Sequence, residues 1–194
     1  MATVDRLRLR LASSSPQRSA ILTQLGIPFE VVPPAYVEHD LPDADPVSLV
    51  RSHAEGKARS VHRAGAVTLG VDTTVHLDGR VYGKPADAAD ASRMLRELSG
   101  RTHVVLSGVC LLLGDDAIVE HATTDATFRR LTDLDVTTYL ASREWEGRAG
   151  AYAIQGLGGR LVERIDGDYL NVVGLPGGLL LELLRRHAPA LLAP

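Results

Sequence analysis

Residues 66–77 alternate between apolar and polar side chains with the two-residue period of a β-strand. Asp72 lies in the middle of this strand, where carboxylates are depleted because burial removes the water around their charge. A lysine or a metal ion would compensate that charge, and a purely structural salt bridge fits the pattern as well. The two faces of the expected strand carry Val67, Leu69, Val71, Val75 and Leu77, and Thr68, Gly70, Asp72, Thr74 and His76. The segment therefore predicts a sheet with one carboxylate that needs a partner.

A hairpin turn is indicated directly after this strand by Asp-Gly at residues 78–79. Counting pairs back from a two-residue turn places Thr73 opposite Lys84, with Asp72 beside it. The hairpin is thus expected to bring a carboxylate near an amine. An ordinary cross-strand ion pair, worth only ~0.2 to 1 kcal/mol on a surface, is the alternative interpretation.

Strand and helix patterns alternate along the rest of the chain, which predicts an α/β protein. A loop rich in proline and acidic residues is expected at 32–46. The remaining strands are expected at 7–11, 29–32, 102–113, 117–128, 161–165 and 169–173. Helices are expected at 16–25 with Ser15 as N-cap, from about 46 to 61, at 87–99, from 132, and over 174–186.

The chain length of 194 residues is near that of one ordinary domain, so we expect a single domain over residues 1–194. A net charge of -3 and a pI near 6.1 argue against nucleic acid or an anionic membrane as partners, since both require a basic face. The single cysteine, Cys110, excludes an internal disulfide. The N-terminal segment lacks the continuous apolar stretch of a signal peptide or membrane anchor, and the expected location is the cytoplasm.

Residues 13–18, SSSPQR, have the parts of an anion site. They combine backbone amides at a helix start, three hydroxyls that include Ser13, and Arg18 one turn into the helix. Phosphate is the natural ligand of such a site. A plain helix cap with a surface arginine is the simpler interpretation when this segment is taken alone.

Two further side chains are candidates for binding. Lys57 lies seven residues after Val50 on the apolar stripe of the helix expected from residue 46. A lysine directed inward loses hydration unless an anion meets it, although its stem can also extend to the surface. Gln155 lies in the glycine-rich stretch 147–159, where its amide suits either a nucleobase edge or the loop's own backbone.

Several nucleotide and hydrolase motifs are missing from the sequence. It has no GxxxxGK[ST] loop, no complete GxGxxG fingerprint, no HExxH pair and no GxSxG elbow. A structural zinc site is improbable with one cysteine and scattered histidines. The chemistry therefore has to be sought in the residues above.

Five segments in order resemble the motifs of the Maf family of nucleoside triphosphate pyrophosphatases. They are LASSSPQR at 11–18, EGKA at 55–58, GVDTTV at 70–75, GKPADAADASRMLRELSGRTH at 83–103 and AGAYAIQGLGGRLVERIDGDYLNVVGLP at 149–176. The segment AGAYAIQG is similar to the corresponding motif of the family branch that acts on dTTP and UTP, whereas the motif of the 7-methyl-GTP branch contains a serine. The resemblance covers nearly the whole chain.

This resemblance implies a mixed, strongly twisted β-sheet flanked by helices, with a deep cleft, and a homodimer. The implied reaction converts a nucleoside triphosphate to the monophosphate and pyrophosphate with Mg²⁺ or Mn²⁺. The implied site residues are Asp72 as proton acceptor, Lys57 and Lys84 in catalysis, Ser13 and Arg18 on the triphosphate, Thr73 and Gln155 near the base, and Asp72 with Glu38 at the metal.

Two positions depart from the family pattern, Gln17 in place of an arginine and Gly56 in place of a glutamate. Neither change touches Asp72 or Lys84, and we expect activity to survive. Modified pyrimidine nucleotides remain alternative substrates. The alternative from another functional class is a regulatory protein of cell division that binds nucleotide without turning it over.

Overall fold

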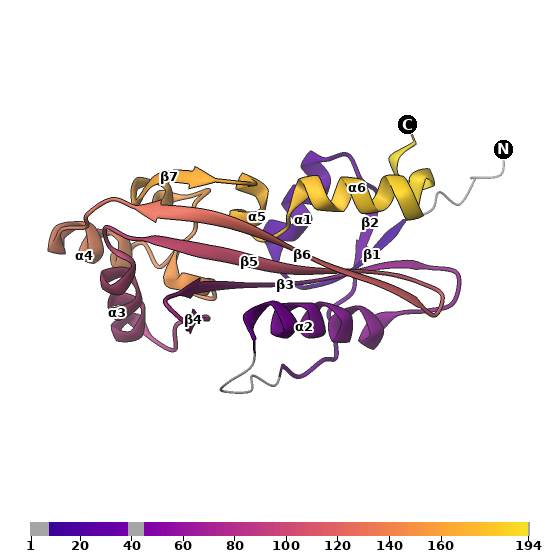
Figure 1. Ribbon diagram of the computed structural model, residues 1–194, viewed down its shortest axis with the longest axis horizontal. Coiled ribbons are helices and arrows are strands. Elements are labelled where there is room, and N and C mark those ends of the chain that lie inside the picture. Colours follow the sequence, from indigo (N-terminus) through magenta and orange to yellow (C-terminus); the bar gives the residue numbers. More distant parts are fainter. Residues whose placement is uncertain (1–7, 39–44, 194) are drawn as a thin grey trace.

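The computed structural model describes residues 8–38 and 45–193. Its centre is a seven-stranded mixed sheet in the order β2-β1-β3-β5-β6-β7, with β4 paired to β3 (Figure 1). Strand β1 runs parallel to β2 and β3, and the other pairs are antiparallel. The strands are β1 (Leu9–Ala12), β2 (Phe29–Val31), β3 (Val67–Leu77), β4 (Arg80–Tyr82), β5 (Thr102–Leu113), β6 (Asp116–Phe128) and β7 (Val162–Asp166).

Helices cover both faces of the sheet, which confirms the predicted fold class. Helix α2 lies on one face of β3 and β5, and α1 and α6 lie on the other (Figure 1). No helix among residues 8–38 and 45–193 is long and apolar enough to cross a membrane. The α-helices are α1 (Pro16–Gln24), α2 (Pro46–Val61), α3 (Ala88–Leu98), α4 (Asp133–Ala141), α5 (Tyr169–Val173) and α6 (Gly177–His187), and the short 3₁₀ helices are η1 (Ala149–Ala151), η2 (Leu157–Arg160) and η3 (Pro189–Leu192).

Two glycines let the backbone of α2 rest directly on the sheet. A Cβ at Gly70 would lie 1.9 Å from the carbonyl oxygen of Ala54, and one at Gly108 would lie 2.1 Å from that of Val50. Gly108 is the residue opposite Asp72 in the β3–β5 ladder. The close approach therefore brings α2 against the part of the sheet that carries the carboxylate.

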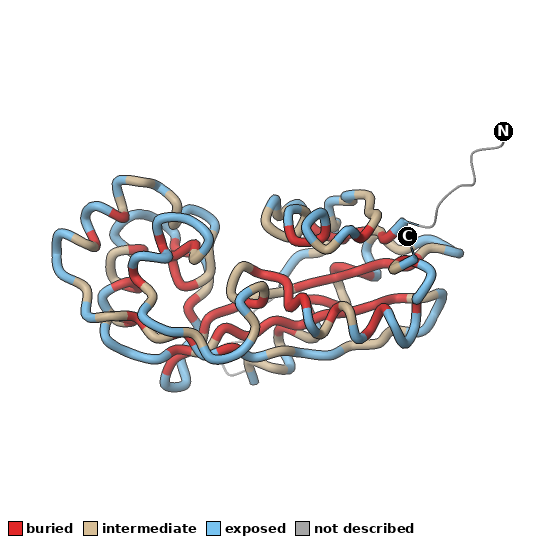
Figure 2. Tube along the Cα trace, turned by 90° about the horizontal axis from the view of Figure 1, so that it is seen from above, coloured by how far each residue is buried: buried red, intermediate tan, exposed pale blue. Residues whose placement is uncertain are grey.

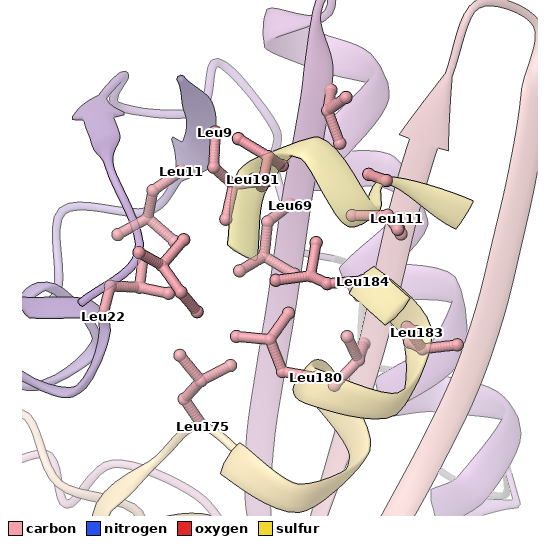
Figure 3. Packing of buried hydrophobic residues seen from close by; sticks show 14 of the residues in the cluster. Leu9, Leu11, Leu22, Leu69, Leu111, Leu175, Leu180, Leu183, Leu184 and Leu191 are labelled. Carbon is pink, nitrogen blue, oxygen red and sulfur yellow. The ribbon is translucent and has the colours of Figure 1, made fainter. Parts of the chain in front are cut away.

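Two apolar cores occupy the two ends of the long strands, and buried residues mark both ends in Figure 2. The first core packs α1, α6 and η3 against β1 and the first half of β3, largely through leucines (Figure 3). The second core packs α3, α4 and η1 against the other end of β3 and the nearby parts of β5 and β6. The leucines of the first core shown in Figure 3 are Leu9, Leu11, Leu22, Leu69, Leu111, Leu175, Leu180, Leu183, Leu184 and Leu191.

The strand predicted at 169–173 is wrong, because this segment forms helix α5. The side chain of Asp168 caps the helix by accepting from the amide of Leu170, and Gly174 ends it at φ 129°. The buried amide of Asn171 donates to the carbonyl of Val105 on β5. Capping and a tertiary hydrogen bond thus outweigh the β-propensity of the valines here.

Most other predicted elements are present within about two residues of their predicted bounds. Ser15 occupies the N-cap position of α1, but its hydroxyl donates to the side chain of Gln17 and does not cap the helix, which corrects the expected role. Residue 7 of the predicted strand 7–11 and residues 39–44 of the predicted loop 32–46 lie outside the described residues.

Candidate functional site

A cavity of about 660 Å³ lies between the two cores. Its walls come from the end of β1 and the start of α1, from α2, from the middle of β3, from the loop after β4, and from the turn that leads into η1. Seven of the eight predicted site residues line it. These are Ser13, Arg18, Glu38, Lys57, Asp72, Thr73 and Lys84.

Lys57 joins the two predicted carboxylates at the centre of the site. Its Nζ lies 2.5 Å from Oδ1 of Asp72 and 2.6 Å from Oε1 of Glu38. The lysine is buried on the inner face of α2, as its place on the apolar stripe predicted. Partial burial raises the pKa of Glu38. The hydrogen bond from Lys57 and the positive charges of Lys57, Lys84 and His53 lower it by more, so the pKa of Glu38 lies below its ordinary value.

His53 is a site residue that the sequence reasoning missed. It is buried one turn before Lys57 on α2, and its Nδ1 lies 3.7 Å from Oδ2 of Asp72. Its spacing of four residues from Lys57 was the available signal, because residues four apart share a helix face. Asp72 therefore presents one oxygen to the lysine and the other to the imidazole.

Glu38, His53 and Asp72 have the donor set of a divalent cation site. One ligand atom from each lies within 4.8 Å of the other two. Two ligands that bind one metal at about 2.1 Å cannot be more than about 4.2 Å apart, so the 3.7 Å separation of His53 and Asp72 already fits. The ligand oxygen of Glu38 lies within 4.8 Å of the other two ligand atoms, and a small shift of this exposed side chain would bring it within the same limit.

Arg18 is held on the opposite face of β3 from Asp72. Its guanidinium donates to Ser13 Oγ at 3.0 Å, to Thr73 Oγ1 at 3.3 Å and to the carbonyl of Gly174 at 3.0 Å. Thr73 faces Arg18 because neighbouring strand residues point to opposite faces. Burial lowers the pKa of Arg18, and the negative charges of Asp72 and Glu38 offset part of this effect by raising it. The guanidinium stays protonated at neutral pH.

Lys84 lines the cavity from the loop that follows β4. The expected pairing of Thr73 with Lys84 is wrong, because the β3–β4 ladder ends at Val75 and Tyr82. The carbonyl of Gly83 accepts from the amide of Gly150 at 3.2 Å and does not extend the ladder. Among the described residues, the lysine that salt-bridges Asp72 is thus Lys57 and not Lys84.

Gln155 is exposed and is not among the residues that line the cavity. It lies between η1 and η2, in a segment that is fixed at both ends. The amide of Ala153 donates to the hydroxyl of Tyr139 at 2.9 Å, and the amide of Leu157 donates to Glu144 Oε2 at 2.7 Å. The structure thus separates Gln155 from the seven residues that it brings together.

The two departures from the family pattern have different surroundings. Gln17 lines the cavity and accepts from the Ser15 hydroxyl at 3.0 Å. At Gly56, a Cβ would lie 2.2 Å from the ring of Tyr36, which itself packs edge-to-face on His53. A glutamate at position 56 would displace that ring, so the glycine matches the tyrosine that covers it.

Arg148 is a second residue of the cavity wall that the sequence reasoning missed. It precedes η1, and its Nε is buried with no hydrogen-bond partner among the described residues. Arg148 lies directly before the AGAY motif, which begins at residue 149, so the motif gave no signal for it. Four cations therefore line the cavity, namely Arg18, Lys57, Lys84 and Arg148.

Comparisons with known proteins agree on one family. The sequence model of the family described as "Maf-like protein" matches residues 8–187. A protein of Symbiobacterium thermophilum named dTTP/UTP pyrophosphatase is 48% identical over 171 residues, which cover 87% of this chain and 88% of the relative. Proteins of the same name are 45% identical in Deinococcus radiodurans, covering 92% of both chains, and 47% identical in Gloeobacter violaceus, covering 92% of this chain and 95% of the relative.

Proposed function

This chain belongs to the Maf family, and from that premise we propose that it hydrolyses dTTP and UTP to the monophosphate and pyrophosphate. One observation carries the proposal beyond the family likeness. The carboxylate of Asp72 lies in a cavity whose walls hold two lysines and two arginines. Such a site suits a polyanion that is attacked by water beside a carboxylate.

Asp72 is the proton acceptor in the proposed reaction. A water oxygen forms a bond to the α-phosphorus while the bond from that phosphorus to the oxygen bridging to the β-phosphate breaks. The proton of the water passes to a carboxylate oxygen of Asp72, and the bridging oxygen departs with pyrophosphate. Lys57 supports this role because its contact with Oδ1 fixes the orientation of the carboxylate.

The cations of the cavity bind the triphosphate and offset the charge that develops on it. Arg18, held by Ser13 and Thr73, is preorganised and needs little reorientation when a phosphate arrives. Lys57 and Lys84 reach the same cavity from separate elements. Their combined charge favours a ligand with several phosphates over an uncharged one.

A divalent cation, Mg²⁺ or Mn²⁺, completes the proposal. Asp72 and Glu38 would hold it, with His53 as a nitrogen donor, and the donor geometry given above fits such an ion. When bound, the cation neutralises phosphate charge and helps to align the substrate. The chain's own groups then bind the nucleotide and accept the proton.

Pyrimidine preference is proposed from the names of the relatives and from the AGAYAIQG motif. Thr73 and Gln155 are the proposed base-specificity residues. Gln155→Glu replaces an amide donor by an acceptor, so the ranking of bases should change. An unchanged ranking of dTTP, UTP and CTP would remove Gln155 from the specificity site.

We extend the proposal to a single domain over residues 1–194 that acts as a homodimer in the cytoplasm. The continuity of one sheet through both cores supports the single domain. The homodimer is supported by the family resemblance, and sedimentation of the purified protein would measure it. A monomer at all concentrations would contradict that part.

The proposed function is tested by a product assay. Purified protein with Mg²⁺ or Mn²⁺ is given dTTP, UTP, CTP, GTP, 7-methyl-GTP and modified pyrimidine triphosphates, and pyrophosphate is separated from orthophosphate. Faster release of pyrophosphate from dTTP and UTP than from the purine nucleotides is expected. Tight binding without product would favour the regulatory alternative, and orthophosphate would place the attack at another phosphorus.

A further inference from the structure

The turn at residues 148–151, which leads through η1, has an unusual backbone. Gly150 and Ala151 both have positive φ, 67° and 58°, and alanine rarely adopts that conformation. A Cβ at Gly150 would lie 2.9 Å from a methyl carbon of Val75 on β3. Such strain persists only when the surrounding contacts hold the backbone in place, and it concentrates at functional sites.

One backbone hydrogen bond ties this turn to the loop that carries Lys84. The amide of Gly150 donates to the carbonyl of Gly83 at 3.2 Å. Lys84 follows Gly83, and Arg148 lies two residues before Gly150. The turn and the loop therefore form one wall of the cavity, and each contributes a cation to it.

The charge of Arg148 has no carboxylate partner among the described residues, unlike that of Lys57. Its Nε is buried without a hydrogen bond in this part of the chain. The nearby carboxylate of Glu146 lies 2.7 Å from Arg143. Burying a guanidinium nitrogen without an acceptor is costly, so this atom requires a hydrogen-bond acceptor, and a phosphate oxygen would be a charge-assisted one.

We propose that Arg148 binds the end of the triphosphate that leaves as pyrophosphate, with Lys84 beside it. This assignment rests on the proposed function. In phosphoryl transfer, the attacking and leaving oxygens lie roughly in line. Asp72, which activates the water, projects toward α2, whereas Val75, against which the turn at 148–151 packs, points to the opposite face of β3. The leaving group, in line with the water, therefore departs on the side of the wall that this turn forms with the Lys84 loop. Arg148 belongs to that wall, and a guanidinium suits bidentate recognition of phosphate.

Equilibrium binding tests this assignment without requiring turnover. Titration calorimetry with pyrophosphate and with UMP, each at a fixed Mg²⁺ concentration, is compared for the wild-type protein, Arg148→Gln and Arg148→Lys. Arg185→Gln serves as the matched control, because Arg185 is exposed on α6 and does not line the cavity. Thermal unfolding of each variant verifies that it is folded.

Arg148→Gln should weaken pyrophosphate binding about 10- to 100-fold, as expected for loss of a charge-assisted hydrogen bond, while UMP affinity changes less than about twofold. Arg148→Lys should recover part of the loss, and Arg185→Gln should match the wild type. Across the wild type and the Arg148 variants, the KM for UTP should increase in the same order as the dissociation constant for pyrophosphate.

Equal losses for pyrophosphate and UMP would overturn the assignment, because they indicate a general structural role. Unchanged pyrophosphate affinity in Arg148→Gln would overturn it too, as would a wild-type protein that does not bind pyrophosphate. If the selective loss occurs in a protein that forms no product, the assignment of Arg148 stands and the proposed hydrolysis fails.

Discussion

Lys57 Nζ lies 2.5 Å from Oδ1 of Asp72, and this contact joins helix α2 to strand β3 at the centre of the cavity. Both side chains are largely shielded from water, so each charge depends on the other for compensation. The second oxygen of Asp72 faces His53 and not the lysine. The carboxylate is therefore oriented by one contact while its other oxygen remains for chemistry.

Replacing Asp72 by Asn should separate catalysis from binding. The amide keeps the shape of the side chain but cannot accept the proton of water, so kcat should fall by about 10²- to 10⁴-fold. Nucleotide affinity should be largely kept, because the cations of the cavity remain. Steady-state kinetics with UTP and calorimetry with a non-hydrolysable analogue measure the two effects.

Asp116→Asn is the control for this change, since Asp116 is exposed at the start of β6. It should behave as the wild type in both assays. Near wild-type turnover of Asp72→Asn with nucleotide bound would show that the proton-acceptor and metal roles are both wrong.

His53→Leu should alter metal preference. Imidazole nitrogen favours Co²⁺ over Mg²⁺, which prefers oxygen ligands, so loss of the ring should weaken Co²⁺ binding about 10-fold or more and Mg²⁺ binding much less. The visible absorption of bound Co²⁺ reports the nitrogen ligand directly, and Mg²⁺ is measured by competition. His121→Leu, at an exposed position on β6, is the control. An unchanged Co²⁺ spectrum and affinity in His53→Leu would exclude the ring from the site.

Gly70→Ala should disturb both stability and activity. The added methyl would lie 1.9 Å from the carbonyl oxygen of Ala54, so α2 must move away from the sheet and take Lys57 with it. A loss of about 1 to 3 kcal/mol in the free energy of unfolding is expected from such overpacking, together with lower kcat. Denaturant unfolding and UTP kinetics measure these changes.

Gly178→Ala is the matched control, because a Cβ there meets its nearest atom at 3.8 Å. Its effect on the free energy of unfolding should stay within about 1 kcal/mol, as for an exchange of glycine and alanine in a helix. Equal behaviour of the two variants would contradict the argument that glycine permits the close approach of α2.

His103 should make the protein less stable in mild acid. It is fully buried against Phe128 and Tyr152, and burial lowers its pKa from 6.5 to about 4. Between these values the unfolded chain binds more protons, so the free energy of unfolding falls as the pH decreases from 6.5 to 4. The slope is at most about 1.4 kcal/mol per pH unit, and the contribution is constant above and below this window.

Denaturant unfolding of the wild type and His103→Gln at pH 7, 6, 5 and 4.5 checks this expectation. The variant should be less stable at pH 7 but should lose less stability on acidification. Equal losses between pH 7 and 4.5 would show that His103 does not titrate in this way.

Local pattern was sufficient to predict the elements that contribute Asp72 and Lys57. The two-residue alternation at 66–77 corresponds to β3, and the helical stripe through Val50 places Lys57 on the buried face of α2. These two predictions rest on periodicity, which reports burial on one face of an element. They place the carboxylate and the amine on elements that then pack together.

The errors and omissions depend on contacts between distant parts of the chain. Helix α5 has a local cap at Asp168, but it is also stabilised by the hydrogen bond from Asn171 to Val105 on β5, which no local pattern reveals. The β3–β4 ladder ends before Lys84, and the carbonyl of Gly83 instead accepts from the amide of Gly150, 67 positions further along the chain. Arg148 joins the cavity through that same contact, so its place in the site could not be inferred from spacing.

Hydrolysis of UTP in water enriched in ¹⁸O tests the central claim most directly, because it shows which phosphorus the water attacks. The products are separated, and the position of the label is read by mass spectrometry. Attack at the α-phosphorus predicts pyrophosphate and UMP as products, with one ¹⁸O atom in UMP and none in pyrophosphate. Label in pyrophosphate, or release of orthophosphate with UDP, would contradict the account.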